Sequence, residues 1–153
     1  ARVRTAEADP RSTPHVKGPD LTVLGGLRER ARAEGADEAA ITVDGAVVDG
    51  ATSAILWWRD DALHVPPASL ARVDSVTARQ VLALAVARGV RVVEEEAGPA
   101  ALAGAEAWIV NALHGVRGVT AWAEPDGTHH ALGAPIRADA WHAALERLRR
   151  PWT

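Results

Sequence analysis

Turn-forming residues interrupt this sequence at short intervals and divide its apolar residues into brief segments. The longest apolar segments, such as Ala54–Trp58 and Val81–Val86, are far too short to cross a lipid bilayer. Asp44-Gly45 separates two of the segments, and this dipeptide is typical of a two-residue hairpin turn. We therefore expect a domain of short strands and helices, with no membrane-spanning segment.

Four apolar segments in the first half of the chain predict four consecutive strands that form a meander. These strands are expected at Ala39–Val43, Ala46–Val48, Ser53–Trp58 and Ala62–Val65. Helices and strands alternate in the second half, where further strands are expected at Val90–Glu94, Ala107–Val110 and Gly115–Trp122.

Helical periodicity marks the remaining regular segments. Leu21, Leu24 and Leu27 share one face of a helix that Asp20 caps and Gly35 ends. The other helices are expected at Val76–Arg88, Pro99–Ala103 and Ala138–Arg149. A meander followed by alternating helices and strands predicts a mixed α+β fold.

Composition and charge exclude several kinds of site. The chain has no cysteine, so a disulfide scaffold, a thiolate zinc site and a cysteine nucleophile cannot occur. The formal net charge is −3 and the arginines are interleaved with acids, so we expect no nucleic-acid binding. His129 and His130 would point to opposite faces of a strand, and we expect no metal site. No segment has the pattern of a signal peptide, so we expect a cytoplasmic protein.

Lys17 is the single lysine in a chain that otherwise uses arginine for its positive charges. A lysine amine can lose its proton and bond covalently to a carbonyl carbon, whereas a guanidinium stays charged. Lys17 also lies in a Pro- and Gly-containing turn just before a predicted helix. It is therefore a candidate nucleophile, and the alternative is an ordinary surface lysine in an arginine-rich composition.

Four segments together resemble the class IV aminotransferases, which are pyridoxal 5'-phosphate (PLP) enzymes of fold type IV. The segments occur in the family's order at residues 15–17 (HVK) followed by a helix and 35–39 (GADEA), then at 44–53 (DGAVVDGATS), 66–77 (ending in SVT) and 106–116 (EAWIVNALHGV). The resemblance covers roughly residues 14–122. It implies a mixed β-sheet or pseudo-barrel with flanking helices, as in the large domain of these enzymes.

The resemblance also implies how the whole protein is organised. Residues 1–14 have no periodicity and are expected to form a lead-in, or a linker from a missing N-terminal small domain. Residues 15–153 correspond to the PLP-binding large domain. Family members close their substrate pocket with the small domain and generally form homodimers, so we expect both for the full-length protein.

Each matched residue takes a role from the resemblance. Lys17 is the residue that bonds covalently to PLP and moves a proton, and Asp49 is the acid that pairs with the cofactor's ring nitrogen. The phosphate is expected at the helix start formed by Ser75, Val76 and Thr77. Asn111 and Ala112 would supply further backbone amides, and Ser53, Leu113 and His114 are candidates for the substrate pocket.

Simpler interpretations of these residues remain open. Asp49 can be a turn acid beside Gly50, and Ser75 can be an ordinary helix-capping serine, which the sequence alone favours. Asn111 can be a turn-forming residue at a strand end, and His114 a neutral structural histidine.

The resemblance favours aminodeoxychorismate lyase activity, because Asn111-Ala112-Leu113 is more similar to the lyase branch than to the aminotransferases. That reaction releases pyruvate and p-aminobenzoate, on the path to folate. An amino acid aminotransferase is one alternative. A non-catalytic domain that binds another ligand or partner is a second, favoured by Asp49 in place of the usual glutamate and by Ala54 in place of the usual asparagine.

Overall fold

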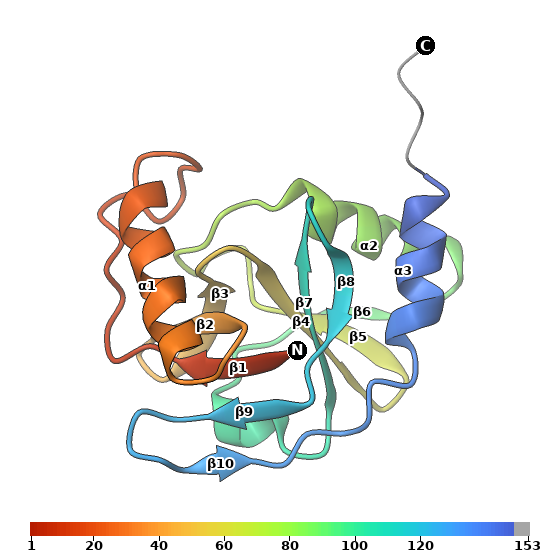
Figure 1. The fold of residues 1–153 in the computed structure, drawn as a ribbon. Helices are drawn as coiled ribbons and strands as arrows, with labels where there is room; N and C mark the ends of the chain where they lie inside the picture. Colours follow the sequence, from red (N-terminus) through yellow and green to blue (C-terminus); the bar gives the residue numbers. More distant parts are fainter. Residues whose placement is uncertain (149–153) are drawn as a thin grey trace.

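The computed structural model describes residues 1–148, which fold into two five-stranded sheets with helices on both outer sides (Figure 1). Sheet A has the strand order β10-β9-β1-β2-β3, and sheet B has the order β6-β5-β4-β7-β8. The strands of sheet A are β1 (Arg2–Thr5), β2 (Glu38–Val43), β3 (Ala46–Gly50), β9 (Ala121–Ala123) and β10 (His129–His130). Those of sheet B are β4 (Ala54–Arg59), β5 (Ala62–Val65), β6 (Val92–Glu94), β7 (Glu106–Asn111) and β8 (Gly115–Gly118).

Three apolar clusters hold these layers together. Between the two sheets, Val3 and Trp122 of sheet A pack with Ile55, Trp57 and Ile109 of sheet B. Helix α1 (Leu21–Ala33) covers the other face of sheet A. Helices α2 (Val76–Ala87) and α3 (Ala138–Glu146) cover the other face of sheet B, on the opposite side of the molecule in Figure 1. The short 3₁₀ helix η1 (Pro99–Leu102) contributes Leu102 to the cluster between the sheets.

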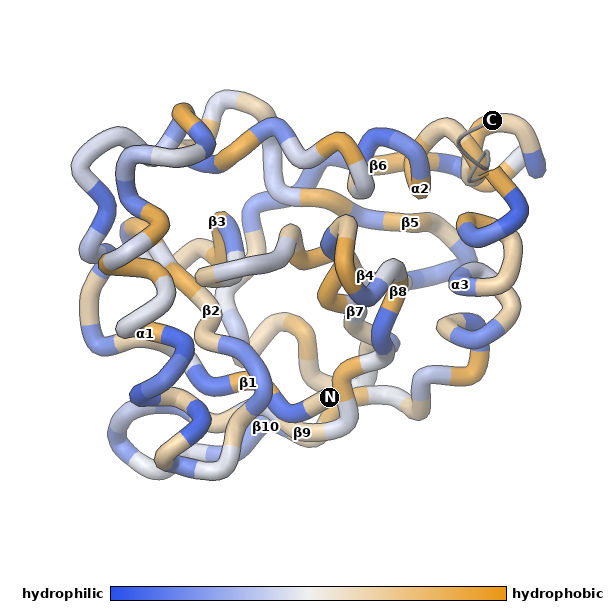
Figure 2. Tube along the Cα trace, turned by 45° about the horizontal axis from the view of Figure 1, so that its top comes forward, coloured by the Kyte–Doolittle hydropathy of each residue, from blue (hydrophilic) through white to orange (hydrophobic). Residues whose placement is uncertain are grey.

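Strand β4 is apolar along almost its whole length because both of its faces are buried. Trp57 points into the cluster between the sheets, and Trp58 points into the cluster beneath α2 and α3. There Trp58 packs edge-to-face on Trp108 and Trp141, with ring centroids 5.5 Å and 5.3 Å apart. Helix α1, by contrast, alternates between hydrophilic and hydrophobic residues, as a helix with one buried face does (Figure 2).

The expected α+β fold, with its mixed sheets and flanking helices, is confirmed. Both predicted hairpins form, with positive φ angles of 50° at Asp44 and 80° at Gly45 in the first, and 49° at Asp60 and 58° at Asp61 in the second. The single four-stranded meander is wrong, because the chain crosses from sheet A to sheet B after Gly50.

The first residues of the predicted lead-in form a strand within the domain. β1 lies between β2 and β9 and pairs with both in parallel. Val3 and Thr5 are buried, whereas Arg2 and Arg4 alternate with them toward solvent. Such a short alternation gives a weak signal, and both partner strands lie far away in the sequence. The boundary predicted at residue 15 therefore does not separate these residues from the domain.

Three further differences lie near the end of the chain. The predicted strand Gly115–Trp122 is two strands, because β8 ends at Gly118 and the chain then enters sheet A as β9. β10 pairs with β9 and was not expected. The last helix ends at Glu146, and Arg149 lies outside the described residues. Among residues 1–148, no helix is long and apolar enough to span a membrane.

Candidate functional site

A cavity of about 440 Å³ lies where the loop before α1, the β3–β4 turn, the start of α2 and the end of β7 meet. We call it the lysine cavity, because Lys17 lines it. All the sequence-predicted site residues except two contribute to its wall: Lys17, Asp49, Ser53, Ser75, Val76, Thr77, Asn111 and Ala112. Leu113 and His114 are exposed in the turn after β7 and are not part of this wall.

Lys17 is exposed in the loop between β1 and α1, and Asp20 organises that loop. The Asp20 carboxylate accepts hydrogen bonds from the backbone N–H groups of Ser12 (3.1 Å) and Thr13 (2.9 Å). It also accepts from the hydroxyls of the same two residues. These donors lower the pKa of Asp20 to about 2. Asp20 occupies the N-cap position, but its side chain does not cap α1 as predicted, because it closes the preceding loop instead.

Asp49 is the last residue but one of strand β3, and its side chain is buried in the cavity wall. Its carboxyl oxygens accept hydrogen bonds from the N–H groups of Val73 (3.1 Å) and Gly50 (3.2 Å). Burial raises the pKa of Asp49 to about 7, although the Val73 N–H and the charge of Arg11 oppose this shift. A carboxyl group with this pKa can hold or release a proton near neutral pH.

Glu38 is a buried acid that sequence reasoning missed. One of its carboxylate oxygens accepts hydrogen bonds from the hydroxyls of Thr52 (2.7 Å) and Ser53, and the other accepts from the Thr52 N–H (3.3 Å). Ser53 in turn accepts from the Asn111 side-chain amide at 3.5 Å. Glu38 therefore holds the β3–β4 turn, which forms part of the cavity wall. In the sequence it is an acid just before an apolar strand, within residues 35–39 (GADEA) of the family resemblance, and neither feature indicates its burial.

The start of α2 forms another part of the wall. Ser75 is the N-cap, and its hydroxyl accepts the N–H of Ala78 at 3.2 Å, so the capping interpretation of Ser75 is confirmed. Val76 is exposed and Thr77 is buried in the first turn. Backbone N–H groups in a first helical turn have no partner within the helix, and they suit an anionic group of a ligand.

Asn111 ends β7 and also forms a turn, as one interpretation of it predicted. Its side-chain oxygen accepts the His114 N–H at 2.8 Å, while its side-chain nitrogen points toward Ser53. The residue therefore joins two loops of the cavity wall.

Arg11 is the second residue that sequence reasoning missed, because it lies in the segment predicted as a lead-in. Its side chain is only 1% exposed, and it forms an ion pair with Asp9 at 2.8 Å. Its Nη1 atom lies 3.6 Å from the nearer oxygen of Asp49. No local sequence pattern indicates this burial, which depends on how the loop folds back against β3.

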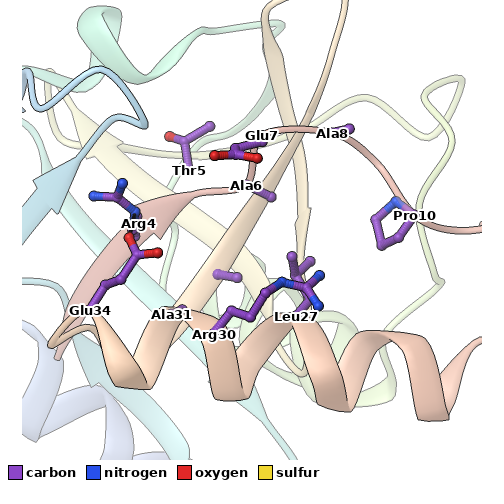
Figure 3. A pocket seen from close by; sticks show the side chains of 11 residues that line it. Arg4, Thr5, Ala6, Glu7, Ala8, Pro10, Leu27, Arg30, Ala31 and Glu34 are labelled. Carbon is purple, nitrogen blue, oxygen red and sulfur yellow. Dashed lines mark ion pairs between the residues drawn. The ribbon is translucent and has the colours of Figure 1, made fainter.

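A second, smaller pocket of about 250 Å³ lies beside the C-terminal half of α1 (Figure 3). We call it the Arg4 pocket. Figure 3 shows Arg4 and Glu34 pointing toward one another at one end, where they form an ion pair, with Leu27 and Arg30 of α1 along the side. None of the sequence-predicted site residues lines it.

Comparisons with known proteins agree with this architecture. The amino-transferase class IV family profile matches residues 2–122. The fold is similar to the T.th. branched-chain amino acid aminotransferase complexed with N-(5'-phosphopyridoxyl)-L-glutamate, with 21% identity, a TM-score of 0.79 and coverage of 99% of this chain and 53% of that one. No curated protein matches the sequence significantly.

Two further solved structures have the same fold. The Escherichia coli branched-chain amino acid aminotransferase has 19% identity and a TM-score of 0.81, over 99% of this chain and 55% of its own. The Legionella pneumophila structure named "Putative 4-amino-4-deoxychorismate lyase" has 16% identity and a TM-score of 0.79, over 95% of this chain and 55% of its own. The chain thus spans about half the length of the solved structures that it matches. With the family profile matched over most of its length, the chain belongs to the class IV aminotransferase family.

Proposed function

We propose that this chain is the cofactor-binding part of a PLP-dependent enzyme, with 4-amino-4-deoxychorismate lyase as the favoured activity. The observation that carries the proposal is that Lys17 and Asp49, distant in sequence, line one cavity. The donor set fits the cofactor: an amine for its aldehyde, a buried carboxyl for its ring nitrogen, and a helix start for its phosphate. The PLP derivative bound to a structural neighbour supports the same assignment.

Each residue of the cavity has a separate role in the proposed reaction. PLP, when bound, draws electrons away from the Cα atom of an amino-acid-like substrate. Lys17 removes the proton from that Cα and can return it elsewhere on the bound molecule. Asp49 keeps the ring nitrogen protonated, and its pKa of about 7 in the protein alone falls once a positive charge faces it. Asn111 and Ala112 would add backbone amides for the phosphate or the substrate, and Ser53 would line the substrate pocket.

Lys17 and the neighbouring Val16, Leu21 and Val76 are exposed around the mouth of the cavity. A reacting amine needs protection from water. We infer that a further part of the full-length protein, an N-terminal small domain, closes the mouth, and that the full-length protein is a homodimer.

The experiment begins with PLP added to the chain and to its full-length parent. Borohydride reduction then fixes any lysine-bound cofactor, and peptide mapping locates it. We expect a visible absorbance band and a label on Lys17, with Lys17→Arg as the control that loses the label. A parent protein that gives no label on Lys17 would contradict the proposal and support the non-catalytic alternative.

Product analysis separates the two activities. A lyase releases p-aminobenzoate and pyruvate from aminodeoxychorismate without any added 2-oxo acid. An aminotransferase requires a 2-oxo acid and forms its amino acid. The Asn111-Ala112-Leu113 sequence favours the first outcome, and a strict dependence on 2-oxo acid would establish the second.

A further inference from the structure

The buried guanidinium of Arg11 is only partly satisfied by the protein. Its Nε and Nη2 atoms donate to the two carboxylate oxygens of Asp9, each at 2.8 Å. One edge of the guanidinium fork is therefore fully used.

The remaining nitrogen of the Arg11 guanidinium, Nη1, has no such partner. Nη1 is buried and has no hydrogen-bond partner among residues 1–148. Its nearest carboxylate is that of Asp49, and their separation of 3.6 Å is too long for a hydrogen bond. A buried donor without an acceptor costs free energy, so its retention calls for an acceptor that the protein itself does not supply.

Arg11 and Asp49 both line the lysine cavity, and they present different chemistry to it. Asp49 can accept a hydrogen bond from a protonated ring nitrogen, whereas Nη1 of Arg11 can only donate. A ligand that satisfies both must carry a donor and an acceptor close together on one side of its ring.

PLP has this arrangement, since its phenolic oxygen is two ring atoms from its nitrogen. Its other acceptors have partners elsewhere under the proposed function: the phosphate at the start of α2, and the aldehyde at Lys17. We propose that Nη1 of Arg11 donates a hydrogen bond to the phenolic oxygen of the cofactor while Asp49 holds the ring nitrogen. This inference rests on the proposed function, and it makes Arg11 a cofactor-binding residue.

The test uses two ligands that cannot bond covalently to Lys17: pyridoxamine 5'-phosphate, and its analogue in which hydrogen replaces the phenolic hydroxyl. Calorimetry measures the dissociation constant of each for the wild-type chain and for Arg11→Gln. We expect Arg11→Gln to weaken pyridoxamine phosphate binding about tenfold or more and to leave the analogue within about twofold.

Arg79→Gln is the matched control. Arg79 is exposed and lies 3.6 Å from Asp74 at the cavity edge, so its loss removes the same charge without removing the buried donor. We expect neither dissociation constant to change. An equal loss for both ligands in Arg11→Gln would overturn the role of Nη1, whereas a wild-type chain and parent that bind neither ligand would overturn the proposed function itself.

A measurement on the wild-type protein covers the case in which Arg11→Gln does not fold. The ultraviolet absorbance of bound pyridoxamine phosphate reports the ionisation of its phenol. A guanidinium that donates to the phenolic oxygen lowers the phenol's pKa below that of the free ligand. A phenol pKa equal to or above that of the free ligand would contradict the proposal.

Discussion

The lysine cavity and the Arg4 pocket lie along the same helix, yet the charged side chains in their walls differ in exposure and in pairing. Leu21 and Leu24 of α1 border the first, and Leu27 and Arg30 border the second. In the Arg4 pocket, Arg4 pairs with Glu34, whose side chain is 50% exposed, so water screens both charges.

In the wall of the lysine cavity two charged groups, Asp49 and Arg11, are buried and incompletely paired. Within residues 1–148, Asp49 has no ion pair at hydrogen-bond distance, and Nη1 of Arg11 has no acceptor. Behind the wall, the Glu38 carboxylate is fully buried among neutral donors. Burying charge in this way reduces stability, so removing these groups should change the free energy of unfolding more than removing the exposed pair of the Arg4 pocket. The contrast can be tested by removing charges on each side.

The largest effect is expected for Asp49→Asn. Burial raises the pKa of Asp49 to about 7, so the folded chain holds a proton that the unfolded chain releases above about pH 4. The free energy of unfolding of the wild type therefore falls as pH rises from 4 to 7. Asparagine does not titrate, so the free energy of unfolding of the variant does not fall in this way. The variant should be more stable than the wild type at pH 8, by at most about 4 kcal/mol, with little difference near pH 4.

Urea unfolding at pH 4.5 and pH 8 measures this difference. Asp126→Asn is the control, because the Thr128 N–H lowers the pKa of Asp126. The contribution of Asp126 to the free energy of unfolding therefore changes only below about pH 4. An Asp49→Asn variant that is less stable than the wild type at pH 8 would mean that the fold compensates the charge of the Asp49 carboxylate.

The next effect in size is expected for Glu38→Ala. This change leaves the buried hydroxyl of Ser53 and the backbone N–H of Thr52 without their acceptor and creates a cavity. We expect a loss of about 3 kcal/mol in the free energy of unfolding, measured by urea denaturation. Ser53→Ala should cost about 1 kcal/mol alone and almost nothing when Glu38 is already alanine. Additive losses would show that the two side chains act independently.

The same contrast explains what could be predicted from sequence. The hairpin at Asp44-Gly45 and the capping of α2 by Ser75 depend on neighbouring residues, so local patterns indicate them. Motifs in a known order likewise grouped Lys17, Asp49 and Asn111, which line one cavity.

Features that depend on distant contacts were not predictable in this way. β1 pairs with β9, more than a hundred residues away, and the crossing from sheet A to sheet B after Gly50 has no local signal. Arg11 and Glu38 look like ordinary charged residues until the fold buries them. Their importance comes from desolvation, which is a property of the whole structure and not of the sequence around them.

A smaller, local effect is expected for Asp20→Asn. Asparagine keeps a good N-cap residue before α1 but cannot accept all the hydrogen bonds that the Asp20 carboxylate receives from Ser12 and Thr13. We expect the amide hydrogens of these two residues to exchange about tenfold faster, while that of Leu27 in α1 is unchanged. Faster exchange throughout α1 would mean that Asp20 stabilises the helix and not the loop that carries Lys17.

The smallest effect is expected in the Arg4 pocket. Glu34→Gln removes half of an ion pair whose side chains are 26% and 50% exposed, so water can solvate the remaining Arg4 guanidinium. The free energy of unfolding should change by less than about 0.5 kcal/mol, and the change should shrink further in high salt. Urea denaturation in low and high salt measures both quantities. A loss as large as that of Glu38→Ala would mean that partial exposure does not distinguish the two pockets, and that the Arg4 pocket also holds charge that the fold must compensate.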